Sequence, residues 1–151
     1  ACSDSRVPIE ILFNAGIGDI FVVENAGNIA NDSVVAGSIE YAAKHLKVPL
    51  IVILGHTKCG AAGAALSDEP AAGNIRTIQE IMAPAAEKAK SITPPLKGEE
   101  LLNAVIKINV LQSKTDLLAK SEIIRSMVDK GSVKIVTAVY DIETGTVDWD
   151  E

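Results

Sequence analysis

Four runs of apolar and β-branched residues predict the strands of a buried sheet. Such runs, bounded by Gly, Pro, Asn or Asp, are typical of strands that are covered on both faces. They cover residues 19–23, 50–54, 134–140 and 146–149. The last run follows a turn signal at residues 143–145, so we expect it to return antiparallel beside the run before it.

The segments between these runs carry apolar residues at helical spacing instead. Pro8 suits the first turn of a short helix, and Asp32 or Ser33 can cap a longer one. Gly131 ends the last helical segment before the third run. The predicted helices span residues 8–14, 33–47, 75–90 and 99–130, the last as one helix or two. A further helix of small residues is predicted from the turn after residues 50–54 to about residue 66.

Strands that alternate with helices indicate an α/β fold with right-handed crossovers. We expect a mainly parallel sheet of about four strands, flanked by helices, with a short antiparallel C-terminal strand. Active sites in sheets of this kind lie at the carboxyl ends of the strands. Cys2 and His56 each stand where such an end is expected, so the fold is predicted to bring them together.

Composition limits the partners and the surroundings of the chain. Its 151 residues are 48% hydrophobic and 23% charged, with a formal net charge of −6, so we expect a globular protein that does not bind nucleic acid. No apolar run approaches the roughly 20 residues of a membrane span, and we expect no signal peptide within these residues. The two cysteines stand in contexts that favour metal binding or catalysis, as in a reducing cytosol, and we predict a cytoplasmic location.

Three residues offer the nitrogen and sulfur donors that zinc prefers. His56 and Cys59 lie three apart in the turn after residues 50–54, so they can face one point, and Cys2 lies beside another turn. Two cysteines and one histidine leave one tetrahedral position open, which is the catalytic pattern of zinc. His45 falls within a helix, and we interpret it as a structural or surface histidine. On spacing alone, the cysteines could also be buried and inert.

Asp4 and Arg6 belong to the same extended segment as Cys2. Residues two apart point to one side of such a segment, so a thiolate, a carboxylate and a guanidinium are predicted to line one wall. Asp4 could bind zinc directly and close the site, or it could orient a zinc-bound water while Arg6 holds it away from the metal. The alternative is that Asp4 and Arg6 form an ordinary ion pair.

Two motifs together resemble those of the β-class carbonic anhydrases. They are Cys-Ser-Asp-Ser-Arg-Val at residues 2–7 and Gly-His-Thr-Lys-Cys-Gly at residues 55–60. The resemblance continues at residues 18–23, 25–28, 37–42 and 138–145 and so extends over nearly the whole chain. The Asn-Ala-Gly-Asn turn at residues 25–28 is similar to that of the bacterial and archaeal members.

This resemblance implies reversible hydration of carbon dioxide to bicarbonate by a hydroxide bound to zinc. It implies one zinc ion per chain, held by Cys2, His56 and Cys59, with Asp4 as a fourth ligand only in a closed state. It further implies that Asp4 and Arg6 act as a catalytic dyad.

The resemblance also implies a backbone donor, an assembly and a difference in length. The N–H of Gly60 matches a donor that the family places near the substrate. Family members form an obligate dimer, often assembled further, so we expect a homodimer or larger homo-oligomer without a membrane partner. They also carry N-terminal helices and a full first strand. We therefore expect residues 1–151 to be a single domain that lacks those helices and part of that strand.

Two other functions stay open at the same zinc site. Carbon disulfide and carbonyl sulfide hydrolases resemble this family and use similar ligands, so access to the pocket would decide between the substrates. The domain could instead be a non-catalytic, zinc-stabilised assembly module with Asp4 locked on the metal. Arg6 argues against that module, because a lasting bond between Asp4 and zinc would leave the guanidinium without its partner.

Overall fold

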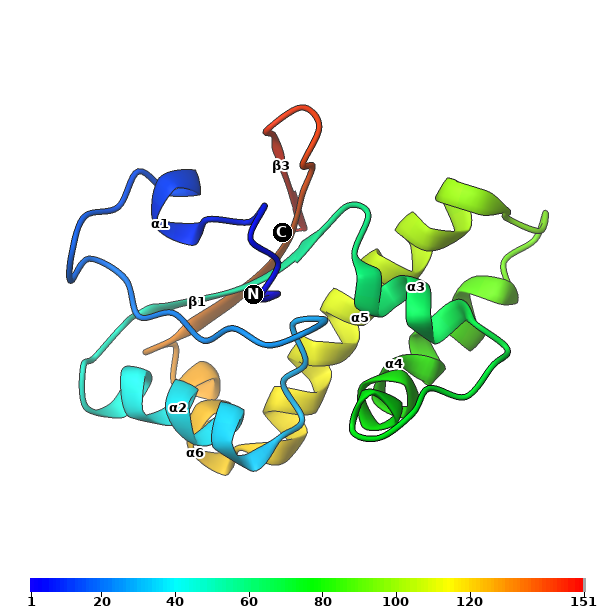
Figure 1. Ribbon diagram of the computed structural model, residues 1–151. Helices are drawn as coiled ribbons and strands as arrows, with labels where there is room; N and C mark the ends of the chain where they lie inside the picture. Colours follow the sequence, from blue (N-terminus) through cyan, green and yellow to red (C-terminus); the bar gives the residue numbers. More distant parts are fainter. Residues whose placement is uncertain (151) are drawn as a thin grey trace.

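A mixed sheet of three strands forms the centre of the computed structural model, which describes residues 1–150 (Figure 1). β1 (Leu50–His56) and β2 (Lys134–Tyr140) pair in parallel, up to the pair of His56 with Tyr140. β3 (Val147–Asp150) lies antiparallel on the other edge of β2. The predicted α/β fold and its antiparallel C-terminal strand are therefore confirmed.

Among residues 1–150, six helices flank the sheet, each where the sequence pattern predicts one. Asp32 caps the second of them by accepting hydrogen bonds from the backbone N–H groups of Val34 and Val35. Within this part of the chain, no helix has the length and the apolar character needed to cross a membrane. The helices are α1 (Ile9–Leu12), α2 (Ser33–Lys44), α3 (Gly60–Leu66), α4 (Ile75–Lys90), α5 (Gly98–Lys120) and α6 (Glu122–Asp129).

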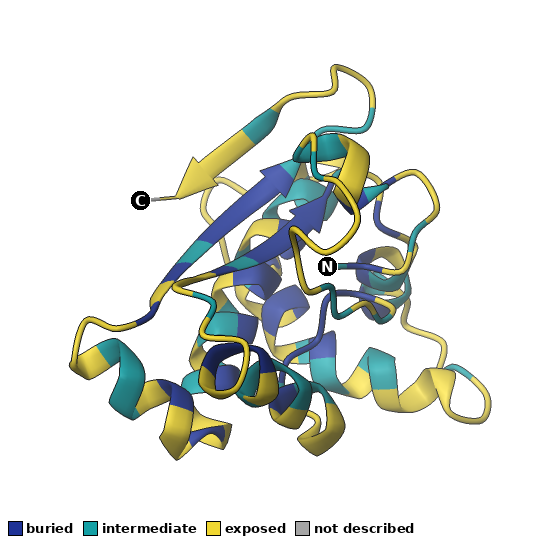
Figure 2. Cartoon of the chain, turned by 90° about the vertical axis from the view of Figure 1, so that its left-hand side faces the viewer, coloured by how far each residue is buried: buried dark blue, intermediate teal, exposed yellow. Residues whose placement is uncertain are grey.

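Different parts of the chain cover the two faces of the sheet. α5 packs on β1 and β2 through a buried stripe that includes Val110, and α3 and α4 lie beside α5 (Figure 1). On the opposite face, Val7 and Ile9 of the N-terminal segment pack with Leu54 and Ala138 of the strands. β1 and β2 are consequently buried along most of their length (Figure 2). This packing fixes the carboxyl ends of both strands.

Residues 19–23 do not form a strand, so the prediction of one there is wrong. In the part of the chain that the structure describes, the nearest pairing is an isolated parallel bridge between Cys2 and Asn25, just beyond the run. Phe21 is 43% exposed, whereas a buried strand was predicted. Apolar, β-branched composition favours a strand, but a strand also needs a backbone partner along its length.

An apolar trough separates this run from β1, the edge strand of the sheet. We call it the β1 trough; it has a volume of about 470 Å³ and is lined chiefly by residues 19–23 and 48–54. Ala1 also lines it, and its amino group donates a hydrogen bond to the carbonyl oxygen of Val23 (2.9 Å). The N-terminal segment therefore lies at the trough, next to the residues that form the site described below.

Candidate metal centre

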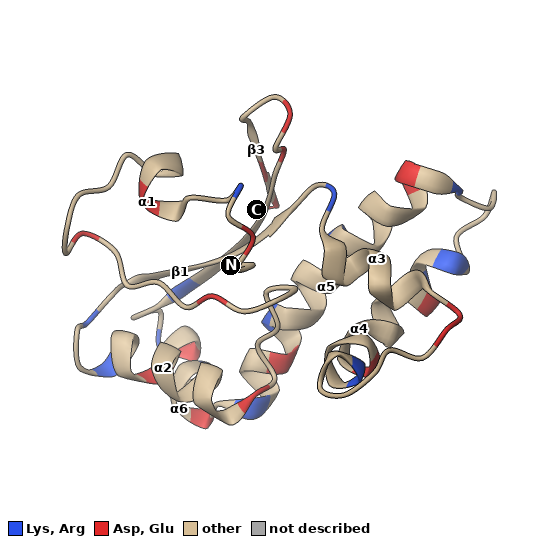
Figure 3. Ribbon diagram, viewed as in Figure 1, with Lys and Arg blue, Asp and Glu red and all other residues tan. Residues whose placement is uncertain are grey.

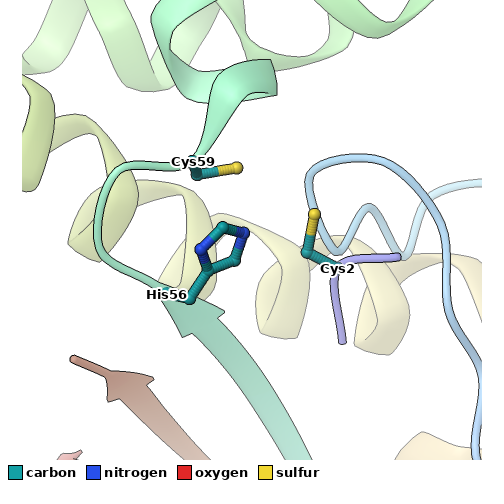
Figure 4. Close-up of side chains that lie close together, drawn as sticks. All are labelled: Cys2, His56 and Cys59. Carbon is teal, nitrogen blue, oxygen red and sulfur yellow. The ribbon is translucent and has the colours of Figure 1, made fainter. Parts of the chain in front are cut away.

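Three buried side chains from separate parts of the chain converge on one point (Figure 4). Cys2 belongs to the N-terminal segment, His56 ends β1, and Cys59 directly precedes α3 as its N-cap residue. Their potential ligand atoms all lie within 4.8 Å of one another. The structure thus brings together the three residues that the sequence singled out as zinc ligands.

The imidazole of His56 presents a free ring nitrogen to this cluster. Its Nδ1 lies 2.9 Å from the carbonyl oxygen of Thr57, which can only accept a hydrogen bond, so Nδ1 carries the proton. Nε2 is buried and has no hydrogen-bond partner among the described residues. An unpaired buried nitrogen is unfavourable unless it binds something, and a metal ion fits this lone pair.

The two thiols also fit a cation. The hydrogen bond from Cys59 lowers the pKa of Cys2, and the same contact raises the pKa of Cys59. A divalent metal would allow both sulfurs to bind as thiolates. The backbone N–H of Gly27 donates a further hydrogen bond to the Sγ of Cys2 (3.4 Å).

Gly27 is needed for this contact. Its φ is +79°, and a Cβ there would lie 2.7 Å from the Sδ of Met82. α5 holds the turn at residues 25–28 in place. Asn109 donates a hydrogen bond to the carbonyl oxygen of Gly27 (2.9 Å), and Ser113 donates one to that of Asn28 (3.0 Å). The sequence analysis missed Asn109 and Ser113. The signal was available, since they are polar residues four apart within the apolar stripe of a helix.

Asp4 and Arg6 lie beside the cluster as an ion pair. Arg6 donates from Nε to Oδ1 of Asp4 (2.9 Å) and from Nη2 to Oδ2 (2.7 Å). Hydrogen bonds from the Arg6 side chain hold the pKa of Asp4 well below its usual range, so the carboxyl is ionised at neutral pH. Its Oδ2 lies 3.9 Å from Nε2 of His56. The carboxylate is thus within reach of the cluster but held by the guanidinium.

The remaining candidates lie at the edge of the site or away from it. Gly60 is exposed and begins α3, where backbone N–H groups have no partner within the helix. His45 stacks on Tyr41 with ring centroids 5.1 Å apart, at the end of α2, and is not part of the cluster.

Known proteins similar to this chain share one description. A family model for carbonic anhydrase matches residues 1–147. Carbonic anhydrase 2 of Mycobacterium tuberculosis is 38% identical over 148 residues, which cover 95% of this chain and 69% of that protein. A carbonic anhydrase of Pseudomonas aeruginosa is 35% identical over 158 residues, which cover 98% of this chain and 70% of that protein.

Solved structures agree with these sequences. The β-carbonic anhydrase of Coccomyxa in complex with acetazolamide has a TM-score of 0.89 at 29% identity, over 98% of this chain and 68% of that chain. A tetrameric β-carbonic anhydrase of Sordaria macrospora has a TM-score of 0.86 at 31% identity, over 98% of this chain and 76% of that chain. The family match over residues 1–147 spans both segments that form the cluster.

Proposed function

The chain belongs to the β-carbonic anhydrase family and is an enzyme for the reversible hydration of carbon dioxide, and we propose that one zinc ion on Cys2, His56 and Cys59 supplies its reaction centre. The observation that carries this proposal is the convergence of two sulfurs on a buried, unpartnered Nε2. When bound, zinc lowers the pKa of a coordinated water toward roughly 7 and so provides a nucleophile at neutral pH.

Asp4 and Arg6 have separate roles beside the metal site. The carboxylate of Asp4 accepts a hydrogen bond from the reacting water and orients it, because it stays ionised beside the cluster. Arg6 restrains that carboxylate through two hydrogen bonds, which keeps it from becoming a fourth metal ligand. The N–H of Gly60, at the exposed start of α3, donates to an oxygen of the substrate.

Activity and metal content test this proposal together. Purified protein should contain one zinc per chain and should hydrate carbon dioxide increasingly fast from about pH 6 to 9, since the nucleophile must lose a proton while Asp4 stays ionised. Parallel assays with carbon disulfide test the hydrolase alternative, which none of the relatives reported above supports by name. Stoichiometric zinc without hydration at any pH would instead favour the non-catalytic module.

The chain functions as a dimer or larger homo-oligomer in the cytoplasm. The β1 trough and exposed Phe21 and Trp149 leave apolar surface that a second copy would cover, and the Sordaria macrospora relative is described as tetrameric. Cys2 and Cys59 form no disulfide with each other, which suits a reducing compartment. Acidic residues stand among the basic ones on α2, α4, α5 and α6, which does not suit nucleic acid (Figure 3). Light scattering should show at least a dimer at micromolar concentration, and a stable monomer would contradict this assembly.

A further inference from the structure

The turn from His56 to Cys59 is held by a segment about 85 residues away in the chain. The N–H of Thr57 donates to the carbonyl oxygen of Tyr140 (2.9 Å), at the end of β2. The Thr57 hydroxyl accepts a hydrogen bond from the N–H of Ile142 (3.1 Å) and donates one to Oδ1 of Asp141 (3.4 Å). One side chain thus ties this turn to the loop between β2 and β3.

Asp141 is itself fixed by its own loop. Its Oδ1 accepts hydrogen bonds from the N–H groups of Glu143 (2.8 Å) and Thr144 (3.4 Å), and its carbonyl oxygen accepts one from Gly145 (2.8 Å). The acceptor that Thr57 meets is therefore supported by contacts that do not involve Thr57. The contact can position the turn rather than follow it.

The turn carries two carbonyl groups that face the site. The carbonyl of Thr57 lies against Nδ1 of His56, and the carbonyl of Lys58 accepts a hydrogen bond from Nη2 of Arg6 (3.2 Å). Lys58 has a φ of +57°, a left-handed conformation that a residue other than glycine keeps only when its surroundings hold it there. If the contacts of Thr57 change, the Lys58 carbonyl should move, and its hydrogen bond with Arg6 should change with it.

We propose that Thr57, held by Asp141, is a positioning residue that places the Lys58 carbonyl so that Arg6 keeps the Asp4 carboxylate off the metal. The inference rests on the proposed zinc centre. Nη2 of Arg6 bonds both Oδ2 of Asp4 and the Lys58 carbonyl, so this carbonyl sets where the guanidinium lies. If the carbonyl moves, Arg6 loses that anchor and Asp4 is free to become a fourth ligand.

The test is Thr57→Val, which removes the hydroxyl while keeping β-branching and nearly the same size. Zinc content should stay near one per chain, while kcat for carbon dioxide hydration should fall at least about tenfold, as for other groups that orient a metal site. With cobalt(II) in place of zinc, the visible absorption spectrum should change, because a carboxylate enters the metal's coordination. Thr57→Ser keeps the hydroxyl and should restore both readouts.

The matched control is Thr115→Val, the same substitution on the exposed surface of α5. The Thr115 hydroxyl donates to the carbonyl oxygen of Leu111 (3.1 Å) and contacts neither the turn nor Asp141, so activity and spectrum should match the wild type. Wild-type kcat and spectrum in Thr57→Val, an equal loss in Thr57→Ser, or loss of activity only through loss of zinc would each overturn the proposal. If Thr57→Val does not fold, Asp141→Asn weakens the same contact and should shift the cobalt spectrum in the same direction. Failure of the zinc proposal is distinguishable, because the wild type itself would then lack zinc or activity.

Discussion

The two edges of β1 are supported very differently by the rest of the chain. One edge pairs with β2 along the whole strand, and the other faces the β1 trough. His56 ends the paired strand and Cys59 lies three residues beyond it, whereas Cys2 belongs to the segment at the trough, joined to Asn25 by an isolated bridge. Two of the three donors are therefore positioned by extended pairing and packing, and the third by a few local contacts. The candidate metal centre therefore lies between the well-supported side of the molecule, where β1 pairs with β2, and the weakly supported side at the β1 trough.

Loss of a donor on the paired side should have the largest effect. Cys59→Ser should remove zinc and lower carbon dioxide hydration by at least about two orders of magnitude, because a hydroxyl is a poor replacement for a thiolate ligand. Zinc analysis and activity should fall together. A Cys59→Ser protein that retains stoichiometric zinc would show that the paired side does not supply this ligand.

Arg6→Ala acts on the link between the two sides, because Arg6 stands on the N-terminal segment but bonds the carbonyl of Lys58. Freed from the guanidinium, Asp4 should bind the metal, and turnover at pH 7 should fall about tenfold or more with zinc content near normal. Arg76→Ala, which breaks an exposed pair with Glu80, is the matched control and should leave activity unchanged. Wild-type turnover in Arg6→Ala would mean that Asp4 and Arg6 form only an ordinary ion pair.

The difference between the two sides also explains what the sequence could and could not predict. Local signals are short-range, so the sequence correctly placed the helix end at Gly131 and narrowed the cap to two residues, of which Asp32 is the one observed. The run at residues 19–23 has strand composition, but pairing depends on a neighbouring segment that composition does not describe.

The contact between Thr57 and Asp141 was beyond prediction for the same reason. The hold of Asp141 on Thr57 joins residues 84 apart, and neither residue type indicates the other. The three donors could be singled out because their chemistry and spacing form recognisable motifs. The convergence of Cys2 and His56 was also predicted, because both stand where carboxyl ends of parallel strands are expected, and their ligand atoms do lie together in the folded chain.

A smaller effect is expected from crowding the paired strand without touching a donor. Gly55→Ala would place a Cβ 2.5 Å from Cγ2 of Val110 on α5, and such overpacking should lower the free energy of unfolding by about 1–3 kcal/mol. Gly63→Ala is the matched control, because its Cβ meets nothing within 4 Å and it lies within α3. Urea unfolding should separate the two variants. Equal stability would mean that α5 does not pack tightly on the end of β1.

The smallest effect should come from removing the negative charge of Asp141, which lies in the loop between β2 and β3 on the paired side. The N–H of Glu143 holds the pKa of Asp141 below its usual range, so the folded state binds its proton less readily than the unfolded chain does. The stability that this carboxylate contributes is therefore fully present above its ordinary value of 3.8 and is lost as the pH falls through the lower, folded value. Asp141→Asn keeps an acceptor oxygen but removes the charge, so its urea midpoint should lie slightly below that of the wild type at pH 7, and the two should converge in acid. Both proteins lose zinc as the pH falls, so the difference between them, rather than either midpoint alone, reports on Asp141. A difference that stayed constant from pH 7 to below pH 3 would show that the carboxylate charge does not support this loop.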